Sequence, residues 1–468
     1  MHVLPNALIW CTQRASRACA REVPTMTDAL KACTHETVTR RSWFMRVDGW
    51  IGIVVLLFLS TFILAHRVRY LVPHDASHTH NSTLHMLNDD LNIFEGWGTV
   101  INDWLLPFNS SITSQDIHDT FMQARGWPVI FQHIRGNFHV FDPNGHCSGY
   151  GGGKHWAAFA LRRCFAIYSI LKETATDMRG SLPDFEFVYD LGDLPLWGST
   201  NAAPNHRSMP GFGAIRCWEK GFMSFPMFGS HEHWDIRDID EENARILNRT
   251  PRPFAHRRSA AVFRGESKGC SFPPEHSDML NWHSHEFGNF YKGAPCGRHK
   301  LQVISQERPD LVNFAFTEAE KPNMSLEQQE NSFKYIVSIE GNGGWADRLS
   351  QLMFHNVGVI VQEHPCKEWY EEMFRPFQHY IPVSNDLSNL LGRISWAEHH
   401  PEQVENMIRA KIARAKKVLS KQGIVTFSNV LWTRYAVLQR YPITLRNGTV
   451  ALADLFQKNH NGSFQTGN

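Results

Sequence analysis

The sequence predicts an α/β protein with two lobes, on the basis of its apolar patterns and its length. Two short, continuous apolar runs, Tyr335–Ile339 and Val357–Val361, are typical of strands buried in a parallel sheet. Between them, Trp345–His355 carries apolar residues at helical spacing. A chain of 468 residues is long enough for two domains with separate cores, so we expect two such α/β lobes.

Further apolar patterns extend this organisation in both directions along the chain. Phe185–Leu191 predicts a strand bounded by proline and glycine, and Ser259–Phe263 predicts another. Glu402–Lys421 has one apolar face and predicts a long amphipathic helix, and Val425–Tyr441 predicts a final apolar helix. We expect these two helices to return from the C-terminal lobe.

Residues 50–66 form a predicted transmembrane signal anchor. The segment is almost wholly apolar as far as Ala65, and its length is near the short limit for a membrane-spanning helix. Basic residues are more numerous before it than just after it: Arg14, Arg17, Arg21, Lys31, Arg40, Arg41 and Arg46 precede it, and Arg67 and Arg69 follow it. This asymmetry favours a cytosolic N-terminus and a translocated C-terminal bulk. A cleaved signal peptide and an Arg-rich organellar transit peptide are the alternatives.

The anchor divides the chain into regions of different expected character. We expect a cytosolic tail over 1–49, a stem over 67–95, an N-terminal lobe over 96–254, a C-terminal lobe over 255–441 and a tail over 442–468. The formal net charge of +1 provides no global field that attracts nucleic acid, so nucleic acid is not an expected partner.

Glycosylation sequons and cysteines predict the same orientation of the chain. All Asn-x-Ser/Thr sequons follow the anchor, at Asn81, Asn109, Asn248, Asn323, Asn447 and Asn461. An even set of cysteines also follows it: Cys147, Cys164, Cys217, Cys270, Cys296 and Cys366. In an oxidising compartment this set can form up to three disulfides in any of fifteen connectivities, of which Cys147–Cys164 and Cys270–Cys296 are the local loops.

A glycine-rich loop between the two apolar runs of the C-terminal lobe has the composition of an anion site. Its candidate residues are Gly341, Gly343, Gly344, Trp345 and Arg348. Glycines allow close approach of the backbone to a ligand, and the planar guanidinium of Arg348 matches phosphate oxygens. Glu363 follows the second run, about 20 residues beyond the glycines, where dinucleotide-binding folds place a carboxylate for ribose hydroxyls. The alternative is a tight turn in which Arg348 makes a surface ion pair.

A second anion-binding element follows the predicted strand Ser259–Phe263. Arg264, Gly265 and Lys268 come directly after it. Because α/β sheets bind ligands at the carboxyl ends of their strands, these residues can reach the same crevice as Arg348. Two arginines around a glycine loop suit a diphosphate leaving group, since they neutralise the charge that develops as a sugar–phosphate bond breaks.

The motifs of this lobe resemble glycosyltransferase family 90, the Rumi-like group of protein O-glucosyltransferases and capsule xylosyltransferases. They are Phe263–Gly265, Glu340–Leu349, the run from Trp369 through Pro376–Val383, Asp386–Ser388 and Trp396. The resemblance is specific from about residue 255 to 440 and looser from about 150 to 255. It implies a GT-B fold with two Rossmann-like lobes facing a cleft. It also implies inverting transfer from a UDP-sugar, with no metal and no other cofactor.

Carried over to this chain, the resemblance assigns roles to individual residues. Arg264 and Arg348 are expected to hold the UDP diphosphate, and Gly343–Trp345 to line the donor. Asp193 takes the position of the catalytic base, which removes the proton of the acceptor hydroxyl as the new bond forms. Asp190 is the rival base, unless one of the two aspartates simply caps the following turn.

The resemblance also implies a substrate and a location. Glucose or xylose is the expected sugar, and a protein or a glycan is the expected acceptor, on the side of the N-terminal lobe. Together with the predicted anchor, it indicates a single-pass type II membrane protein whose catalytic domain lies in the lumen of the Golgi or endoplasmic reticulum.

Three other interpretations of the sequence compete with this one. Asp238-Ile-Asp240 is a DxD sequence, the metal-binding signature of a different class of glycosyltransferase, but it lies in a charged run typical of a solvated face. A serine hydrolase is disfavoured because no GxSxG elbow occurs. A catalytically inactive family member that binds glycan or protein ligands as a receptor is the remaining alternative.

Overall fold

The computed structural model describes most of the chain after residue 92. The described ranges are 93–124, 126–149, 154–192, 209–217, 223–227, 235–266, 297–317, 323–341, 346, 348–364 and 366–460. All of them belong to one compact unit, Asp89–Asn468. The predicted anchor at 50–66 lies outside the described residues. Within the described ranges, no helix has the length and apolar character required to span a bilayer.

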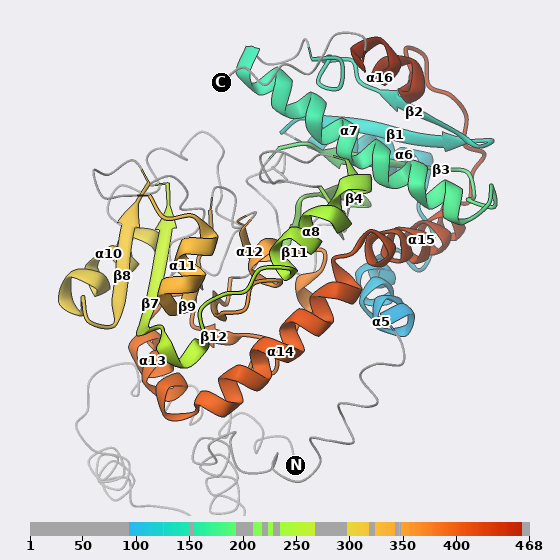
Figure 1. Cartoon of the computed structure of the whole chain (residues 1–468). Helices are drawn as coiled ribbons and strands as arrows, with labels where there is room; N and C mark the ends of the chain where they lie inside the picture. The colour runs from blue at the N-terminus through green and yellow to red at the C-terminus, as the bar shows by residue number, and fades with distance from the viewer. Residues whose placement is uncertain are drawn as a thin grey trace, which may run out of the picture. The chain divides into compact units, whose positions relative to one another are not determined.

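The described residues form a mixed α/β fold around two large sheets (Figure 1). The first sheet has six strands in the order β13-β2-β1-β3-β4-β6. Their bounds are β1 Pro128–Ile134, β2 Asn137–Phe141, β3 Phe185–Asp190, β4 Gly211–Gly213, β6 Met223–Ser224 and β13 Val450–Ala451. Strands β13, β2, β1 and β3 pair antiparallel, whereas β3, β4 and β6 pair parallel.

A tight hairpin accounts for the antiparallel pairing of β1 with β2. Arg135 and Gly136 connect β1 to β2 and have φ angles of 47° and 82°. A two-residue turn with positive φ at both positions matches the twist of antiparallel strands. The Arg135 N–H also donates to the Asp184 carboxylate over 2.7 Å, which anchors the turn. The first lobe therefore differs from the Rossmann-like pattern that the sequence motifs predict for both lobes.

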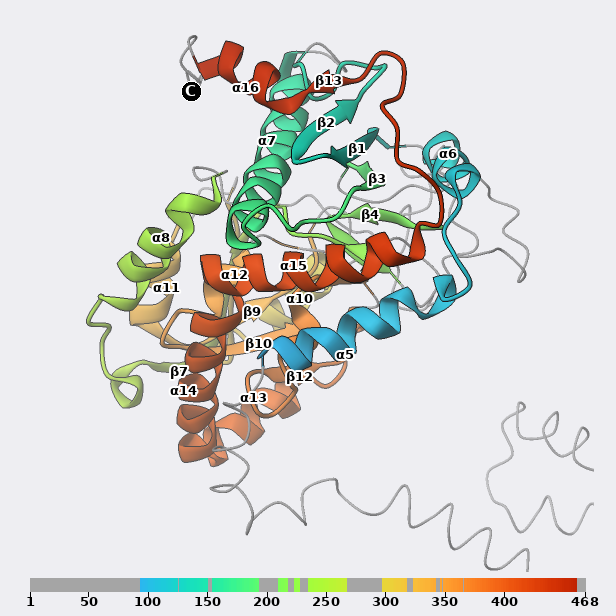
Figure 2. The ribbon, with the colours of Figure 1, turned by 90° about the vertical axis from the view of Figure 1, so that its right-hand side faces the viewer.

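Helices from both ends of the described chain pack against the first sheet. Helix α15 (Lys421–Leu438) lies between α7 (Lys154–Asp177) and α5 (Ile93–Leu105) and contacts both (Figure 2). The Trp432 ring of α15 is fully buried and stacks on Phe185 of β3, with 4.7 Å between ring centroids. Large aromatic rings bury much apolar area, so this contact fastens the C-terminal helix to the N-terminal sheet.

The second sheet is entirely parallel and has the order β12-β10-β9-β7-β8. Its strands are β7 Arg258–Gly265, β8 Val312–Phe316, β9 Phe333–Ser338, β10 Gly358–Gln362 and β12 Ile381–Val383. After β7 the chain adds β8 on one side, and then returns to add β9, β10 and β12 on the other. This is a doubly wound order, and its topological switch point lies between β7 and β9.

Most predicted strands and helices are confirmed. The predicted strands correspond to β3, β7, β9 and β10, and the two predicted long helices are α14 (Pro401–Val418) and α15. Within the predicted helix at 345–355, the described helix α12 covers only Arg348–Leu352.

Part of the expected tail at 442–468 forms regular secondary structure. Strand β13 pairs with β2, and helix α16 (Leu452–His460) follows it. The Phe456 ring is buried and stacks within 5.4 Å of the Tyr168 ring of α7. A strand of two residues has too little periodicity to be seen in a sequence, and its pairing depends on a distant partner.

Candidate functional site

The carboxyl ends of β7 and β9 are neighbours at the switch point of the second sheet. Arg264 and Gly265 end β7, and Gly341 follows β9 by three residues. The register pairs Val262 with Ile336, so the two strands leave the sheet side by side. Open α/β sheets bind ligands at this place, because the loops diverge there and expose backbone donors. The predicted anion site therefore lies where the topology favours a ligand.

Arg348 reaches this place from the first turn of α12. One of its guanidinium N–H groups donates to the carbonyl of Arg264. The guanidinium also lies 4.6 Å from the centroid of the Phe263 ring. These contacts fix the planar group beside the end of β7. The side chain is only partly buried, so a ligand can still approach it.

Gly265 is required by this arrangement. A Cβ atom at this position would lie 2.6 Å from Nη2 of Arg348 and 2.8 Å from Cζ of Phe263. Both distances are shorter than a normal van der Waals contact, so any side chain here displaces the guanidinium. Close packing of the Arg348 guanidinium thus explains why a glycine follows Arg264.

Arg264 is held by the protein itself. Its side chain is buried and donates to the carbonyls of Phe263 and Asn313 over 2.7 and 3.0 Å, and also to the Asn313 side chain. Burial lowers the pKa of its guanidinium. These donors are directed toward β8, while its carbonyl faces Arg348. The contact of Arg264 with a diphosphate therefore remains a prediction.

A polar network across the strand ends was not predicted from the sequence. Arg298, near the start of α10 (Gly297–Glu307), donates to the carbonyls of Glu340 and Glu266 over 2.9 and 2.6 Å. It thereby joins the segments that follow β9 and β7. The Glu340 N–H donates to Gln362, whose amide donates to the Asn385 carbonyl over 2.8 Å. Nothing in the local spacing of these residues marks them, because they meet only in the folded sheet.

The Glu340 carboxyl is the most strongly perturbed acid of this network. Only 4% of the residue is exposed, and Oε1 accepts the Gly297 N–H over 3.2 Å. Burial raises the pKa of the carboxyl to about 7, and the hydrogen bonds from Gly297 and Gln362 counteract this only partly. The group therefore titrates near neutral pH in the folded protein.

We expect Glu340→Gln to flatten the pH dependence of stability. In the unfolded chain a glutamate loses its proton near pH 4.3. Between about pH 4.3 and pH 7 the folded form retains the proton while the unfolded chain loses it. The free energy of unfolding therefore falls as pH rises over this range. The loss should reach about 3 kcal/mol, and urea titrations at pH 5 to 8 measure it. Glu363→Gln, at an exposed site, is the matched control; an unchanged slope in Glu340→Gln would contradict the assignment.

Glu363, the predicted ribose contact, lies one strand away from the switch point. It follows β10, its side chain is exposed, and its N–H donates to the Val383 carbonyl over 2.8 Å. This bond joins the ends of β10 and β12. Contact with a ribose remains a prediction.

The structure describes only some of the other predicted site residues. Asp193, Lys268, Gly343, Gly344 and Trp345 lie outside the described residues. Asp190, the rival base, is fully buried. Its Oδ1 accepts the N–H groups of Trp127 and Gly192 over 2.8 and 2.9 Å. Asp190 therefore caps the turn that leaves β3, which is the structural role considered for one of the two aspartates.

The DxD sequence lies at the start of helix α8 (Ile239–Leu247). Oδ1 of Asp240 accepts the N–H of Lys421, the first residue of α15, over 2.9 Å. Asp240 thus contacts the beginning of another helix. Across the described ranges, no group of three or more His, Cys, Asp or Glu is placed to hold a metal ion.

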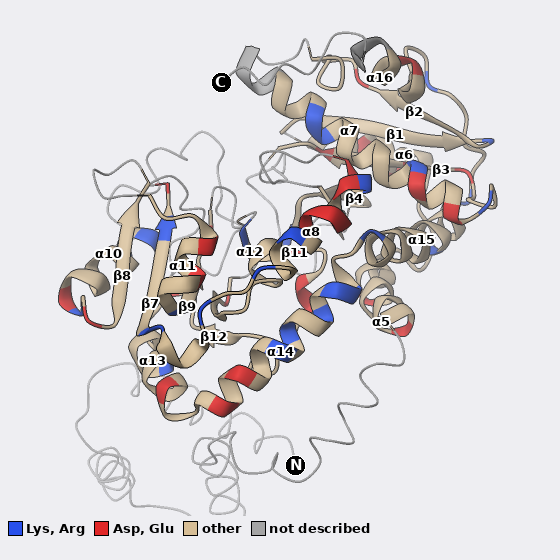
Figure 3. Ribbon diagram, viewed as in Figure 1, with Lys and Arg blue, Asp and Glu red and all other residues tan. Residues whose placement is uncertain are grey.

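The predicted Cys147–Cys164 disulfide is confirmed. Cys366 is also disulfide-bonded, and its register partner across the β5–β11 ladder (Ile215–Cys217 with Cys366–Glu368) is Cys217. The Cys270–Cys296 pair lies outside the described residues. In helix α14 the acidic residues lie toward the N-terminal end and the basic residues toward the C-terminal end (Figure 3).

The fold is that of an α/β protein in which Arg264 and Arg348 lie at the switch point of a doubly wound sheet. The sequence model of the family described as Glycosyl transferase family 90 matches residues 274–463. This match confirms the resemblance to glycosyltransferase family 90 seen in the motifs of the chain.

Curated relatives support the same assignment. The chain is 26% identical over 276 residues to Protein O-glucosyltransferase 3 of Rattus norvegicus, covering 56% of this chain and 47% of that protein. It is 24% identical over 279 residues to Protein O-glucosyltransferase 3 of Homo sapiens, covering 57% and 50%. Protein O-glucosyltransferase 1 of Homo sapiens is 21% identical over 313 residues, covering 61% and 70%. The chain spans about half the length of the O-glucosyltransferase 3 relatives it matches.

Proposed function

We propose that this chain is an inverting glycosyltransferase of GT-B type, in which the second sheet is Rossmann-like and the first sheet is mixed. It transfers a sugar, glucose or xylose, from a UDP-sugar to a hydroxyl group of a protein or glycan. The observation that carries this proposal is the position of Arg348 beside the end of β7, at the switch point of a doubly wound sheet. The match to the family model and the similarity to proteins named O-glucosyltransferases support it further.

The donor half of the reaction is assigned to the second sheet. The UDP diphosphate lies against the Arg348 guanidinium, for which Gly265 leaves room, and Gly341 allows close approach of the backbone. We assign further positive charge to Arg264, which lies in β7, and to Lys268, which follows that strand in the sequence. As the bond between the anomeric carbon and UDP breaks, negative charge grows on the diphosphate. Fixed cationic groups stabilise that charge more in the transition state than in the ground state.

The acceptor half is assigned to the first sheet. Asp190 is occupied as a turn cap, which leaves Asp193, three residues further on, as the proposed base. Its carboxylate takes the proton of the acceptor hydroxyl while the oxygen attacks the anomeric carbon. The bond from that carbon to UDP breaks on the opposite face, so the configuration inverts. Neither a metal nor another cofactor has a role in this scheme.

Several features support a lumenal location. Disulfides such as Cys147–Cys164 persist in oxidising compartments. The sequon asparagines within the described ranges are all exposed: Asn109, Asn248, Asn323 and Asn447. We therefore propose a type II membrane protein of the Golgi or endoplasmic reticulum, attached to the membrane through residues 50–66.

A panel of UDP-sugars tests the proposed function. The purified full-length chain is incubated with each donor, with and without EDTA, and UDP release is measured. We expect turnover of UDP-glucose or UDP-xylose at the same rate in EDTA. Turnover that depends on a divalent cation would favour the DxD interpretation. UDP binding without turnover of any donor would favour the inactive receptor.

A further inference from the structure

A buried arginine holds the segment that leaves strand β3. Arg163 lies on α7, and only 2% of the residue is exposed. Its Nη1 group donates to the carbonyl of Leu191, the first residue after β3. Neither the turn cap of Asp190 nor the proposed donor site explains this buried charge.

An aromatic ring on the same helix supports the Arg163 guanidinium. Phe159 lies four residues before Arg163 on α7, and its ring centroid is 4.6 Å from the guanidinium carbon. Residues four apart lie on the same face of a helix, so the ring and the arginine are neighbours by virtue of the helix itself. The guanidinium is therefore held by its own helix while Nη1 reaches Leu191.

The same segment is also held by the residue before β1. The Leu191 N–H donates to the Trp127 carbonyl over 3.1 Å, and the Trp127 N–H donates to Asp190. The Gly192 N–H donates to Asp190 as well. Three consecutive residues are therefore fixed by hydrogen bonds immediately before Asp193, and Arg163 supplies the one from α7.

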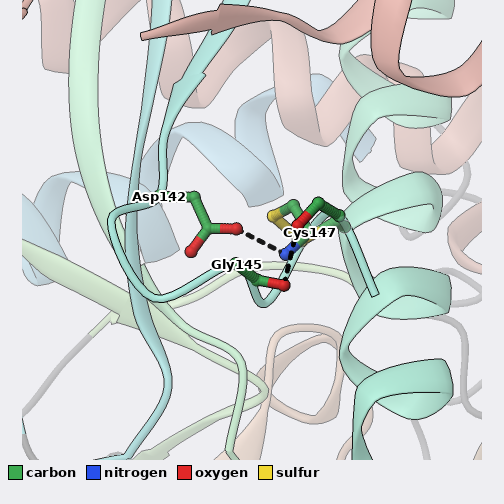
Figure 4. The surroundings of a disulfide bond; sticks show 5 residues. Asp142, Gly145 and Cys147 are labelled. Carbon is green, nitrogen blue, oxygen red and sulfur yellow. Dashed lines mark hydrogen bonds between the residues drawn. A yellow bond between two sulfur atoms is a disulfide. The ribbon is translucent and has the colours of Figure 1, made fainter. Parts of the chain in front are cut away.

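A disulfide joins α7 to the loop that completes this arrangement. Cys164, the neighbour of Arg163, is bonded to Cys147 in the loop after β2 (Figure 4). The Cys147 N–H donates to the Asp142 carboxylate over 2.6 Å. The adjacent His146 stacks against the Trp127 ring with 6.1 Å between centroids. The disulfide therefore links α7 to the loop after β2, and this loop contacts Trp127. Trp127 in turn bonds the end of β3, which Arg163 of α7 also holds.

We propose that Arg163 is a positioning residue for the catalytic base, and that the Cys147–Cys164 disulfide fixes the helix from which it acts. The inference rests on the proposed function, in which Asp193 is the base. Asp193 follows Gly192 directly in the chain, so we infer that a base at this position depends on how the segment before it is held. A displacement of about 1 Å can lower a catalysed rate by about 100-fold.

Substitutions at Arg163 test this proposal. Arg163→Met keeps an apolar stem without donors, Arg163→Lys keeps one cationic donor, and Arg162→Met on the same helix is the matched control. UDP-glucose hydrolysis gives kcat, and calorimetry gives the Kd of UDP. We expect kcat to fall about 10- to 100-fold in Arg163→Met, with partial recovery in Arg163→Lys and an unchanged Kd. A parallel loss of kcat and UDP affinity, or an unchanged kcat, would overturn the proposal.

Hydrogen–deuterium exchange provides a readout that does not depend on the donor. In Arg163→Met, and in a Cys147→Ala/Cys164→Ala double variant, peptides covering 185–192 should exchange faster. Peptides of β7 and β9 should not change. Unchanged exchange at 185–192 would overturn the inference whatever the donor is. If Asp193→Asn retains full turnover, the base assignment fails separately, even where exchange responds as expected.

Discussion

Replacing Asp193 with asparagine should reduce sugar transfer by about 10²- to 10⁴-fold in kcat, while UDP binds as in the unaltered chain. Asparagine has nearly the same shape but cannot accept the proton of the acceptor hydroxyl. The donor contacts are assigned to the second sheet and should not change. The rate of UDP release from the UDP-sugar measures the loss of kcat, and calorimetry with UDP measures whether its Kd changes.

Asp190 provides the contrasting variant. Asp190→Ala leaves the N–H groups of Trp127 and Gly192 without their acceptor, so it should lower the melting temperature as well as activity. Asp193→Asn should leave the melting temperature nearly unchanged. Full turnover in Asp193→Asn would show that the base lies elsewhere.

Replacing Arg348 with alanine should weaken UDP binding about 10- to 100-fold. Hydrogen bonds to charged groups contribute about 1.5–3 kcal/mol, and a guanidinium can make two of them to a diphosphate. The guanidinium is held beside β7 by the Arg264 carbonyl and the Phe263 ring, so little ordering is required when UDP binds. Titration calorimetry with UDP measures the change in Kd.

A matched arginine controls for the loss of a cation–π contact. Arg393 on α13 (Leu390–His399) lies 4.8 Å from the centroid of the Phe377 ring, close to the 4.6 Å of the Arg348–Phe263 pair. Arg393→Ala should leave UDP affinity unchanged. Arg348→Lys should recover only part of the affinity, because an ammonium group lacks the planar fork. Equal UDP affinity in Arg348→Ala and the unaltered chain would show that the diphosphate binds elsewhere.

The second sheet was predictable because its strands are buried on both faces. Continuous apolar runs such as Tyr335–Ile339 stand out in the sequence, and the intervening glycines mark where the strand ends. The first sheet was less predictable. Its β1–β2 hairpin turns at Arg135–Gly136, and its outer strand β13 has only two residues, which pair with Val140 and His139 far back in the chain.

The residues of the candidate site also differ in how well the sequence predicts them. Arg264, Gly265 and Arg348 were found from the sequence because each adjoins a strand or glycine loop, and parallel strands bring their carboxyl ends together. Arg298 and Gln362 were missed because their partners become neighbours only through tertiary packing. The sequence marks Glu340 only as the start of a loop, since its burial depends on α10 folding over it.

The most direct test of the account is a structure of the full-length chain with UDP bound. We predict density for the diphosphate at the carboxyl ends of β7 and β9, within hydrogen-bond distance of the Arg348 guanidinium. Density for UDP elsewhere, such as beside Asp238 and Asp240 at the start of α8, would contradict the account.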